Sequence, residues 1–502
     1  MSPKNGNKLK LSAYLLGAWF LLATSLTSQT VQAPAANRLA LEPTTFKPAS
    51  GEPVAAELGT LIVPEKRQAP SERTIKLKLV RFRSTSQNPG PPIVYLAGGP
   101  GGSGIGAAKG PRFPLFMALR EFGDVIALDQ RGTGESEPKM RCTEWFMVPF
   151  DKPLDRAEAE GIFAAGMKTC FERLSREGID ATAYTTLESA HDIDDLRKAL
   201  GAEKITLWGI SYGTHLALAT LREHGDHVDR AILAGVEPLG HTLKLPSDQE
   251  ALLRSISELA KRDRAVAASV PDLTAAISRL TARLRKEPVT VTLAHPMTRQ
   301  SITVQVGPLD LQYVLAGMLE GPATFAGMPD FVSRLEGGDW TALASQASLF
   351  RAGMLPSAMS VAMDCASGAS TDHLARIQAE AKKTLLGDAI NLPFPGICQG
   401  LGVPDLGDAY RKSFESKTPL LLISGTLDGR TPPRNAEGLM KGFTQAQHLV
   451  IEGAGHSDPL FLSSPQILEA MREFLRGKKI PATRIVLDPV RFLPPQKASK
   501  VD

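Results

Sequence analysis

The sequence predicts an α/β fold in which a mostly parallel sheet carries helices on both faces and a large insertion interrupts the chain. From residue 79 onward, short apolar runs alternate with helical patterns, which is typical of a parallel sheet covered by helices. These runs are continuous Val, Ile and Leu, as expected of strands buried on both faces. They lie at residues 93–96, 125–128, 205–208, 231–233, 420–423 and 448–451, and an antiparallel edge is expected at 60–63 and 75–82.

The strand–helix alternation stops after residue 238 and resumes at Pro419. Helical patterns dominate the interruption, at 249–261, 273–286, 309–319 and 373–383, with an extended patch at 289–293 and 302–306. A segment that leaves a sheet and returns to it is expected to cap the carboxyl edge of the strands, where such folds place their sites. A second domain packed elsewhere is the alternative.

The N-terminus is typical of a secretory signal peptide. Lys4, Lys8 and Lys10 precede an apolar run at 11–26 and a small-residue site, Ala-Pro-Ala, at 33–35. This pattern predicts cleavage after residue 35 and export to the periplasm or the medium, with an uncleaved anchor as the alternative. The expected segments are a signal peptide (1–35), a core (36–238 and 418–480), an inserted cap (239–417) and a C-terminal tail (481–502).

The distribution of charge and the four cysteines bear on the possible partners and on cross-links in the fold. The formal net charge of +4 is spread along the chain, which argues against nucleic acid as a partner. In an oxidising compartment the four cysteines are expected to pair, and three connectivities are possible. We favour Cys142 with Cys170 and Cys365 with Cys398, because each pair closes a loop of about thirty residues. A zinc site is the rival interpretation, but close CxxC pairs are lacking.

The strongest motif is Gly-Ile-Ser-Tyr-Gly at 209–213, between the strand at 205–208 and a helical run at 214–222. A serine acts as a nucleophile only beside a base and an anion-stabilising pocket. A sharp strand-to-helix turn lifts its hydroxyl within reach of both. Bulky side chains two residues to either side would collide in this turn, which accounts for Gly209 and Gly213. Ser211 is therefore the predicted nucleophile, and a chance GxSxG is the alternative.

The predicted base is His456, in Gly-Ala-Gly-His at 453–456, directly after the last buried strand. His191, His215 and His224 are the nearest rivals, but they fall on helical patterns around the turn that carries Ser211. A histidine in a loop at the carboxyl end of a strand can reach that turn.

The third member must orient the imidazole and stabilise its positive charge. Asp428 follows the strand at 420–423 and faces the same sheet edge. The order Ser, Asp, His along the chain is the one that the α/β-hydrolase fold uses. Asp458 lies too near His456 in sequence, so we expect it to cap its loop instead.

Two backbone amides should bind the oxyanion that forms during acyl transfer. One belongs to Tyr212, and the other to Gly99 in the glycine-rich loop at 97–103. A phosphate cradle is the alternative, but the loop has neither a GxGxxG helix start nor a P-loop Lys-Ser/Thr. No metal or organic cofactor is implied.

These motifs, with Asp-Gln-Arg-Gly-Thr-Gly-Glu-Ser at 129–136, resemble the proline iminopeptidase and tripeptidyl aminopeptidase (TAP-like) group of α/β-hydrolase serine peptidases. That group carries GGPG, DQRGxGxS, GxSYG, GxxDxxTP and GxGH, and here the last two lie at 425–432 and 453–456. The resemblance covers about residues 58–239 and 419–475. The iminopeptidases usually have His before GGPG where this chain has Ala97, and the tripeptidyl-type exported relatives are looser there.

The resemblance implies release of an amino acid or short peptide from a free N-terminus, with an acidic patch that pairs with the α-amine. Glu237, after the strand at 231–233, is placed to join such a patch, and a structural carboxylate is the alternative. Asp129 and Arg131 are expected to brace the loops behind the site through a buried ion pair.

The leading hypothesis is an exported serine aminopeptidase that works through an acyl-enzyme intermediate. An exported esterase or amidase with the same triad is the alternative, and a catalytically silent binding protein is a third. The intact Ser, Asp, His set and the complete glycine loop argue against the third. The expected partner is a peptide or a small ester or amide, with no membrane contact after signal cleavage, and the oligomeric state is left open.

Overall fold

The computed structural model describes residues 38–68, 73–295 and 297–494, all of which fall within one compact unit, Ala35–Asp502. The predicted signal peptide and the end of the predicted tail lie outside the described residues. Of the helices in the described ranges, none is both long enough and apolar enough to cross a membrane.

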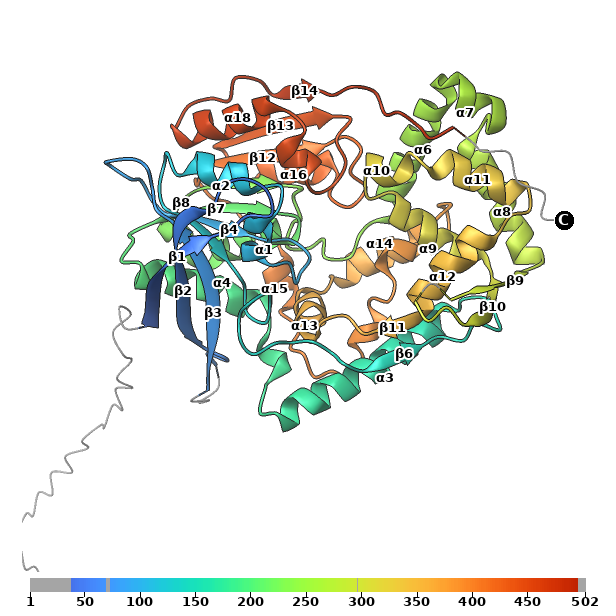
Figure 1. Cartoon of the computed structure of the whole chain (residues 1–502), viewed down its shortest axis with the longest axis horizontal. Coiled ribbons are helices and arrows are strands. Elements are labelled where there is room, and N and C mark those ends of the chain that lie inside the picture. Colours follow the sequence, from blue (N-terminus) through green and yellow to red (C-terminus); the bar gives the residue numbers. More distant parts are fainter. Residues whose placement is uncertain (1–37, 69–72, 296, 495–502) are drawn as a thin grey trace, which may run out of the picture. The chain divides into compact units, whose positions relative to one another are not determined.

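A ten-stranded sheet forms the core, in the order β1-β2-β3-β5-β4-β7-β8-β12-β13-β14 (Figure 1). Strands β1 to β3 and the β3–β5 pair are antiparallel, and every pair from β5–β4 to β13–β14 is parallel. The predicted antiparallel edge is therefore present, with β1 as an additional strand. The strands are β1 (Leu39–Phe46), β2 (Val54–Pro64), β3 (Thr74–Phe82), β4 (Ile93–Leu96), β5 (Val125–Leu128), β7 (Ile205–Ile210), β8 (Val228–Ala234), β12 (Leu420–Gly425), β13 (Ala446–Glu452) and β14 (Arg484–Val486).

Helices cover both faces of this sheet, and the buried strands contribute side chains to the apolar cluster on each face. Leu207 of β7 belongs to the apolar cluster on one face, and its neighbour Trp208 belongs to the cluster on the other. Every residue of β4, β5, β7 and β12 is buried, which explains their uninterrupted apolar sequences. One face carries α4 (Thr186–Ala199), α5 (Tyr212–His224) and α16 (Pro433–Met440), and the other carries α1 (Gly104–Lys109), α2 (Phe113–Leu119), α17 (Pro459–Leu462) and α18 (Pro465–Leu475).

Between β8 and β12 the chain is mainly helical, and much of this segment packs around an apolar cluster of its own. The cluster draws on α6 to α9, α11, α12 and the hairpin β9–β10, and it is distinct from the two clusters of the sheet. The elements here are α6 (Pro246–Arg262), α7 (Arg264–Ser269), α8 (Leu273–Lys286), β9 (Val289–Ala294), β10 (Ser301–Val306), α9 (Pro308–Met318), α10 (Pro322–Phe325), α11 (Met328–Glu336), α12 (Thr341–Arg351), β11 (Ala352–Met354), α13 (Ala358–Ser367), α14 (Thr371–Ala381) and α15 (Gly407–Arg411).

A segment from the first half of the chain joins this helical region. Strand β6 (Trp145–Met147) pairs with β11, and α3 (Arg156–Arg176) lies beside it (Figure 1). The fully buried guanidinium of Arg351 donates to Asp310 and to the carbonyls of Pro149 and Lys152. The helical region is therefore assembled from two separate stretches of sequence, and the expectation from the sequence covered only the second.

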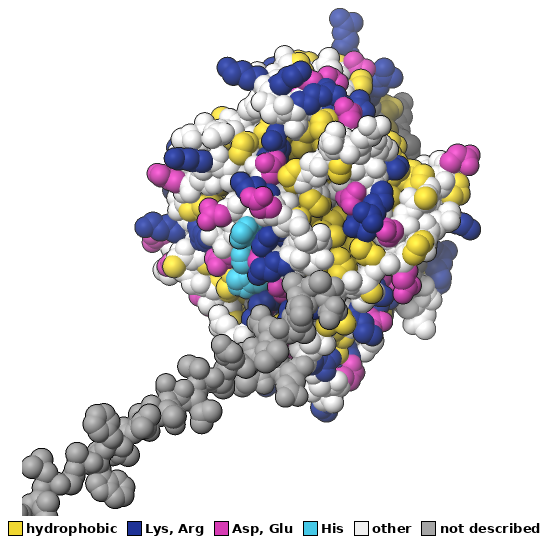
Figure 2. Space-filling model, turned by 90° about the vertical axis from the view of Figure 1, so that its left-hand side faces the viewer, with side chains coloured by type: hydrophobic (Ala, Val, Ile, Leu, Met, Phe, Trp, Pro, Cys, Tyr) yellow, Lys and Arg dark blue, Asp and Glu magenta, His cyan; other side chains and the backbone are white. Residues whose placement is uncertain are grey.

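Both disulfides favoured from the sequence are present, Cys142–Cys170 and Cys365–Cys398. Figure 2 shows one face of the molecule, on which Lys and Arg side chains are interspersed with Asp and Glu. The charges on this face are mixed, as the spread of charge along the sequence predicts.

Candidate active site

Ser211 occupies the tight turn between β7 and α5. Its φ of 54° lies in the left-handed region that non-glycine residues rarely adopt, as expected for a serine presented at such a turn. A Cβ on Gly209 would lie 2.6 Å from the carbonyl oxygen of Gly213, and one on Gly213 would collide with the carbonyl oxygen of Leu96. Only glycine fits at these two positions, which is the steric reason inferred from the sequence.

The structure brings the three predicted side chains into one hydrogen-bonded chain. Ser211 Oγ lies 3.0 Å from His456 Nε2, and His456 Nδ1 lies 2.8 Å from Asp428 Oδ2. Asp428 and His456 are buried, whereas Ser211 is partly exposed. This geometry lets the imidazole accept the serine proton while the carboxylate holds its other nitrogen.

Asp428 is held as a carboxylate by a dense set of donors. The backbone N–H groups of Arg430 and Thr431 each donate to Oδ1 at 2.8 Å, and the Thr431 hydroxyl donates to Oδ2 at 2.6 Å. Burial alone would raise the pKa of Asp428, but the charge and hydrogen bond of His456 and the bonds from Thr431 outweigh it and lower the pKa. Asp428 therefore stays ionised at neutral pH.

The glycine-rich loop packs directly against the serine. A Cβ on Gly98 would lie 3.1 Å from the Ser211 Cβ, so the backbone reaches the serine only because that side chain is absent. Gly99 lines the same cavity as Ser211, and within the described ranges its N–H has no acceptor. Tyr212 begins helix α5, so its N–H is one of the free amides of a helix start. Both amides are thus available to an oxyanion.

Asp129 braces this loop, but not through the ion pair expected from the sequence. Its carboxylate accepts from the Ser103 hydroxyl at 2.6 Å and from the N–H groups of Ile105 and Glu135. Arg131 instead forms a bidentate pair with Asp192 of α4, with both distances 2.8 Å. The prediction of an Asp129–Arg131 pair is therefore wrong, because these two residues, on either side of Gln130, bond to different elements.

The rival residues are engaged elsewhere. Asp458 pairs with Arg112 at 2.7 Å. His191 bonds to His224 at 2.8 Å, and the fully buried His215 bonds to the Tyr410 hydroxyl at 2.7 Å. Burial lowers the pKa of His215 to about 4, so this histidine is neutral at ordinary pH.

Ser211 opens into a cavity of about 640 Å³ between the sheet and the helical region, a volume in the range of small-molecule sites. Glu237 lines this cavity, and its carboxylate is paired with the Lys244 ammonium. Asp364 of α13 lines it too, and within the described chain its carboxylate has no hydrogen-bond or ion-pair partner. Burial, reinforced by the charge of Glu237, raises the pKa of Asp364 well above its usual range.

Sequence reasoning missed four residues of this site: the hydroxyl of Thr431, Lys244, Asp364 and Arg430. Thr431 was visible only as part of GxxDxxTP. Lys244 and Asp364 belong to the inserted region, where no motif marks them, and Arg430 follows the catalytic candidate Asp428 by two residues.

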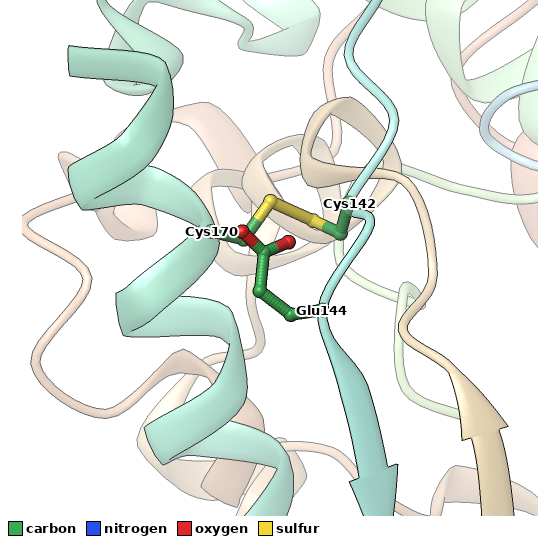
Figure 3. Close-up of side chains that lie close together, drawn as sticks. All are labelled: Cys142, Glu144 and Cys170. Atoms are coloured by element: carbon green, nitrogen blue, oxygen red, sulfur yellow. A yellow bond between two sulfur atoms is a disulfide. The ribbon is translucent and has the colours of Figure 1, made fainter. Parts of the chain in front are cut away.

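Among the residues that the structure describes, one cluster of possible metal ligands, Cys142, Glu144 and Cys170, lies away from this site. Figure 3 shows the two sulfur atoms joined and the Glu144 carboxylate beside them. Thiolates bind metals, whereas a disulfide offers none. Glu144 is in turn paired with Arg173 at 2.8 Å, so these atoms serve a structural cross-link.

Comparisons with known proteins agree with this geometry. Residues 91–288 match the family model described as alpha/beta hydrolase fold, and residues 389–486 match the model described as TAP-like protein. The chain therefore has the α/β-hydrolase fold, and the predicted fold class is confirmed.

Within that class, residues 389–486 form a TAP-like segment, and the chain is similar to serine peptidases of the TAP-like group, as the resemblance predicted. It is 32% identical to serine protease Hip1 of Mycobacterium tuberculosis over 201 residues, which are 37% of either chain. It is 30% identical to tripeptidyl aminopeptidase of Streptomyces lividans over 203 residues, 37% of this chain and 36% of that one. A probable proline iminopeptidase of Streptomyces coelicolor is 29% identical over 156 residues. The chain thus spans little more than a third of the length of these relatives.

Proposed function

We propose that the protein is an exported serine aminopeptidase that releases an amino acid or short peptide from a free N-terminus. The observation that carries the proposal is the acidic lining of the cavity beside Ser211, where Asp364 has no partner within the described residues and Glu237 lies nearby. A carboxylate left unpaired in a partly buried cavity favours a cationic group, and a substrate α-amine supplies one.

In the proposed mechanism, Ser211 Oγ attacks the scissile carbonyl as His456 Nε2 takes its proton. The amides of Tyr212 and Gly99 stabilise the negative charge on the carbonyl oxygen. His456 then gives the proton to the departing amine, which leaves an acyl ester on Ser211. A water molecule attacks the ester with His456 again as the base, and Asp428 stabilises the imidazolium throughout.

Asp364 and Glu237 differ in their readiness to bind an amine. The Glu237 carboxylate is already neutralised by Lys244, so an incoming amine must compete with that ammonium. Asp364 instead holds a proton in the free enzyme, because burial and the charge of Glu237 raise its pKa, and it gives up this proton when it pairs with the amine. We therefore assign the main contact with the amine to Asp364 and a supporting part to Glu237.

An esterase or amidase with the same triad is the second candidate, favoured by the Lys244–Glu237 pair. The test uses protein lacking residues 1–35, with Ser211→Ala as the blank. Chromogenic peptides with free and acetylated N-termini are compared with a nitrophenyl ester. A strong preference for the free amine supports the aminopeptidase, and equal or ester-only turnover supports the esterase.

Asp364→Asn sharpens this test. The variant should lose the preference for the free amine, whereas Asp372→Asn, at an exposed position on α14, should keep it. If Asp364→Asn retains the full preference, the assignment of Asp364 is wrong.

Export is part of the same proposal, supported by the N-terminal sequence and by two disulfides, which form in oxidising compartments. Sequencing the N-terminus of the protein recovered from its producing cells tests it. A start at Ala36 supports signal cleavage, and an intact N-terminus contradicts it.

A further inference from the structure

Arg430 is a second charged group of the site that has no partner within the described part of the chain. Its backbone N–H is bonded to Asp428, which fixes the main chain, but its guanidinium forms no hydrogen bond or ion pair there. A guanidinium carries five N–H donors and remains charged at any working pH. Its charge reaches the cavity, because it counters the rise that burial causes in the pKa of Tyr313.

Arg430 stands where two hollows meet at the serine. It lines the cavity that holds Asp364 and Glu237, and also a second hollow of about 590 Å³ that holds His456. Ser211 and Gly99 are likewise shared by both. Each hollow therefore offers space for the part of the substrate on one side of the bond that is cleaved.

The direction of proton transfer decides which part of the substrate lies in which hollow. The leaving amine receives its proton from His456 Nε2, so the leaving part lies in the hollow that His456 lines. The acyl part, with its free amine, lies on the side of Asp364. Arg430 borders the leaving part directly.

The other charged groups of the second hollow are less suited to an anion. Arg112 is already paired with Asp458 and bonded to the Tyr95 hydroxyl. Glu320 is exposed and carries the same sign as an anionic ligand. Arg430 is thus the cation of this hollow whose donors are unused by the described residues.

We propose that Arg430 binds the C-terminal carboxylate of the leaving group, so that the preferred substrates are short peptides with both termini free. The proposal rests on the aminopeptidase function. A guanidinium matches a carboxylate with two parallel hydrogen bonds, which gives both strength and orientation. A long polypeptide has no carboxylate within reach of Arg430 and gains nothing from it.

The experiment uses alanine peptides of two to four residues, each with a free or acetylated N-terminus and with a C-terminal acid or amide. Products are quantified by mass spectrometry with wild type, Arg430→Gln and Arg430→Lys. Arg434→Gln is the matched control, because it removes the same charge from α16 at a residue that pairs with Asp248 and lines neither hollow.

Wild type should hydrolyse the acids with a kcat/KM about tenfold or more above that of the amides, the size expected for hydrogen bonds to a charged group. Arg430→Gln should bring the ratio near one by slowing the acids alone, Arg430→Lys should restore part of it, and Arg434→Gln should leave it unchanged. Equal turnover of acids and amides by wild type, or an undiminished ratio in Arg430→Gln, overturns the proposal. The first of these needs no variant to fold. The ratio of free to acetylated peptides tests the aminopeptidase function separately, so the two failures are distinguishable.

Discussion

The hydroxyl of Thr431 offers a sharp test of how Asp428 is held. Thr431 is fully buried, donates to Asp428 Oδ2 at 2.6 Å and lies 3.1 Å from His456 Nδ1. Thr431→Val removes this donor with little change of shape. A hydrogen bond to a charged acceptor contributes about 1.5–3 kcal/mol. The carboxylate keeps three other donors, so we expect kcat to fall about 10-fold, and by about 100-fold if the whole contribution is lost.

The assay is steady-state turnover of the best chromogenic peptide across pH. Losing a donor raises the pKa of Asp428, so the acid limb of the kcat profile should move to higher pH. Thr220→Val is the control, since that buried hydroxyl bonds only within helix α5, to the carbonyl of Leu216. A kcat for Thr431→Val within twofold of wild type, or an equal loss in the control, would refute the reasoning.

Three further outcomes are expected. Gly213→Ala should abolish activity or folding, because the added methyl meets a backbone carbonyl of β4, whereas Gly161→Ala, with open space in helix α3, should raise the unfolding free energy by about 0.5–1 kcal/mol. Replacing Cys365 and Cys398 together by Ser should cost about 3–4 kcal/mol, because their disulfide closes a separation of 33 residues, and calorimetry with and without reductant measures the loss. Burial raises the pKa of Asp248 to about 6, so the folded state binds this proton more tightly than the unfolded chain. Stability should therefore fall by about 3 kcal/mol as pH rises from about 4 to about 6, and Asp248→Asn should lack this slope in urea titrations.

Each of these has a clear contrary result. An active, stable Gly213→Ala protein would mean that the turn can open without cost. An unchanged melting temperature in the cysteine double variant would mean that the surrounding packing alone holds this region. A pH slope that persists in Asp248→Asn would have to come from another group.

The core of the fold could be predicted because its causes are local in the sequence. Strands such as β7 and β12 are buried on both faces, and their sequences are therefore continuous runs of mostly apolar residues. Gly209 and Gly213 were identifiable because a turn this tight leaves no room for a side chain at either position, and they mark Ser211 between them. His456 and Asp428 followed from their places directly after strands.

The charged lining of the cavity could not be predicted in the same way. Asp364 lies on α13, whose pattern of apolar residues is that of an ordinary packed helix. The partner of Arg131 is Asp192, far away in the sequence, and an ion pair leaves no periodic trace from which its partner could be inferred. These pairings depend on tertiary geometry.

The two-part origin of the helical region has a practical consequence for engineering. Strand β6 and helix α3 are made long before β11, yet β6 has its ladder partner only in β11, and Arg351 supplies the donors for the carbonyls of Pro149 and Lys152. During synthesis β6 is therefore expected to lack its ladder partner until β11 has been made. A chimera that exchanges residues 239–417 alone would leave β6 and α3 packed against the foreign sequence. The unit to exchange therefore comprises residues 239–417 together with the earlier stretch that carries β6 and α3.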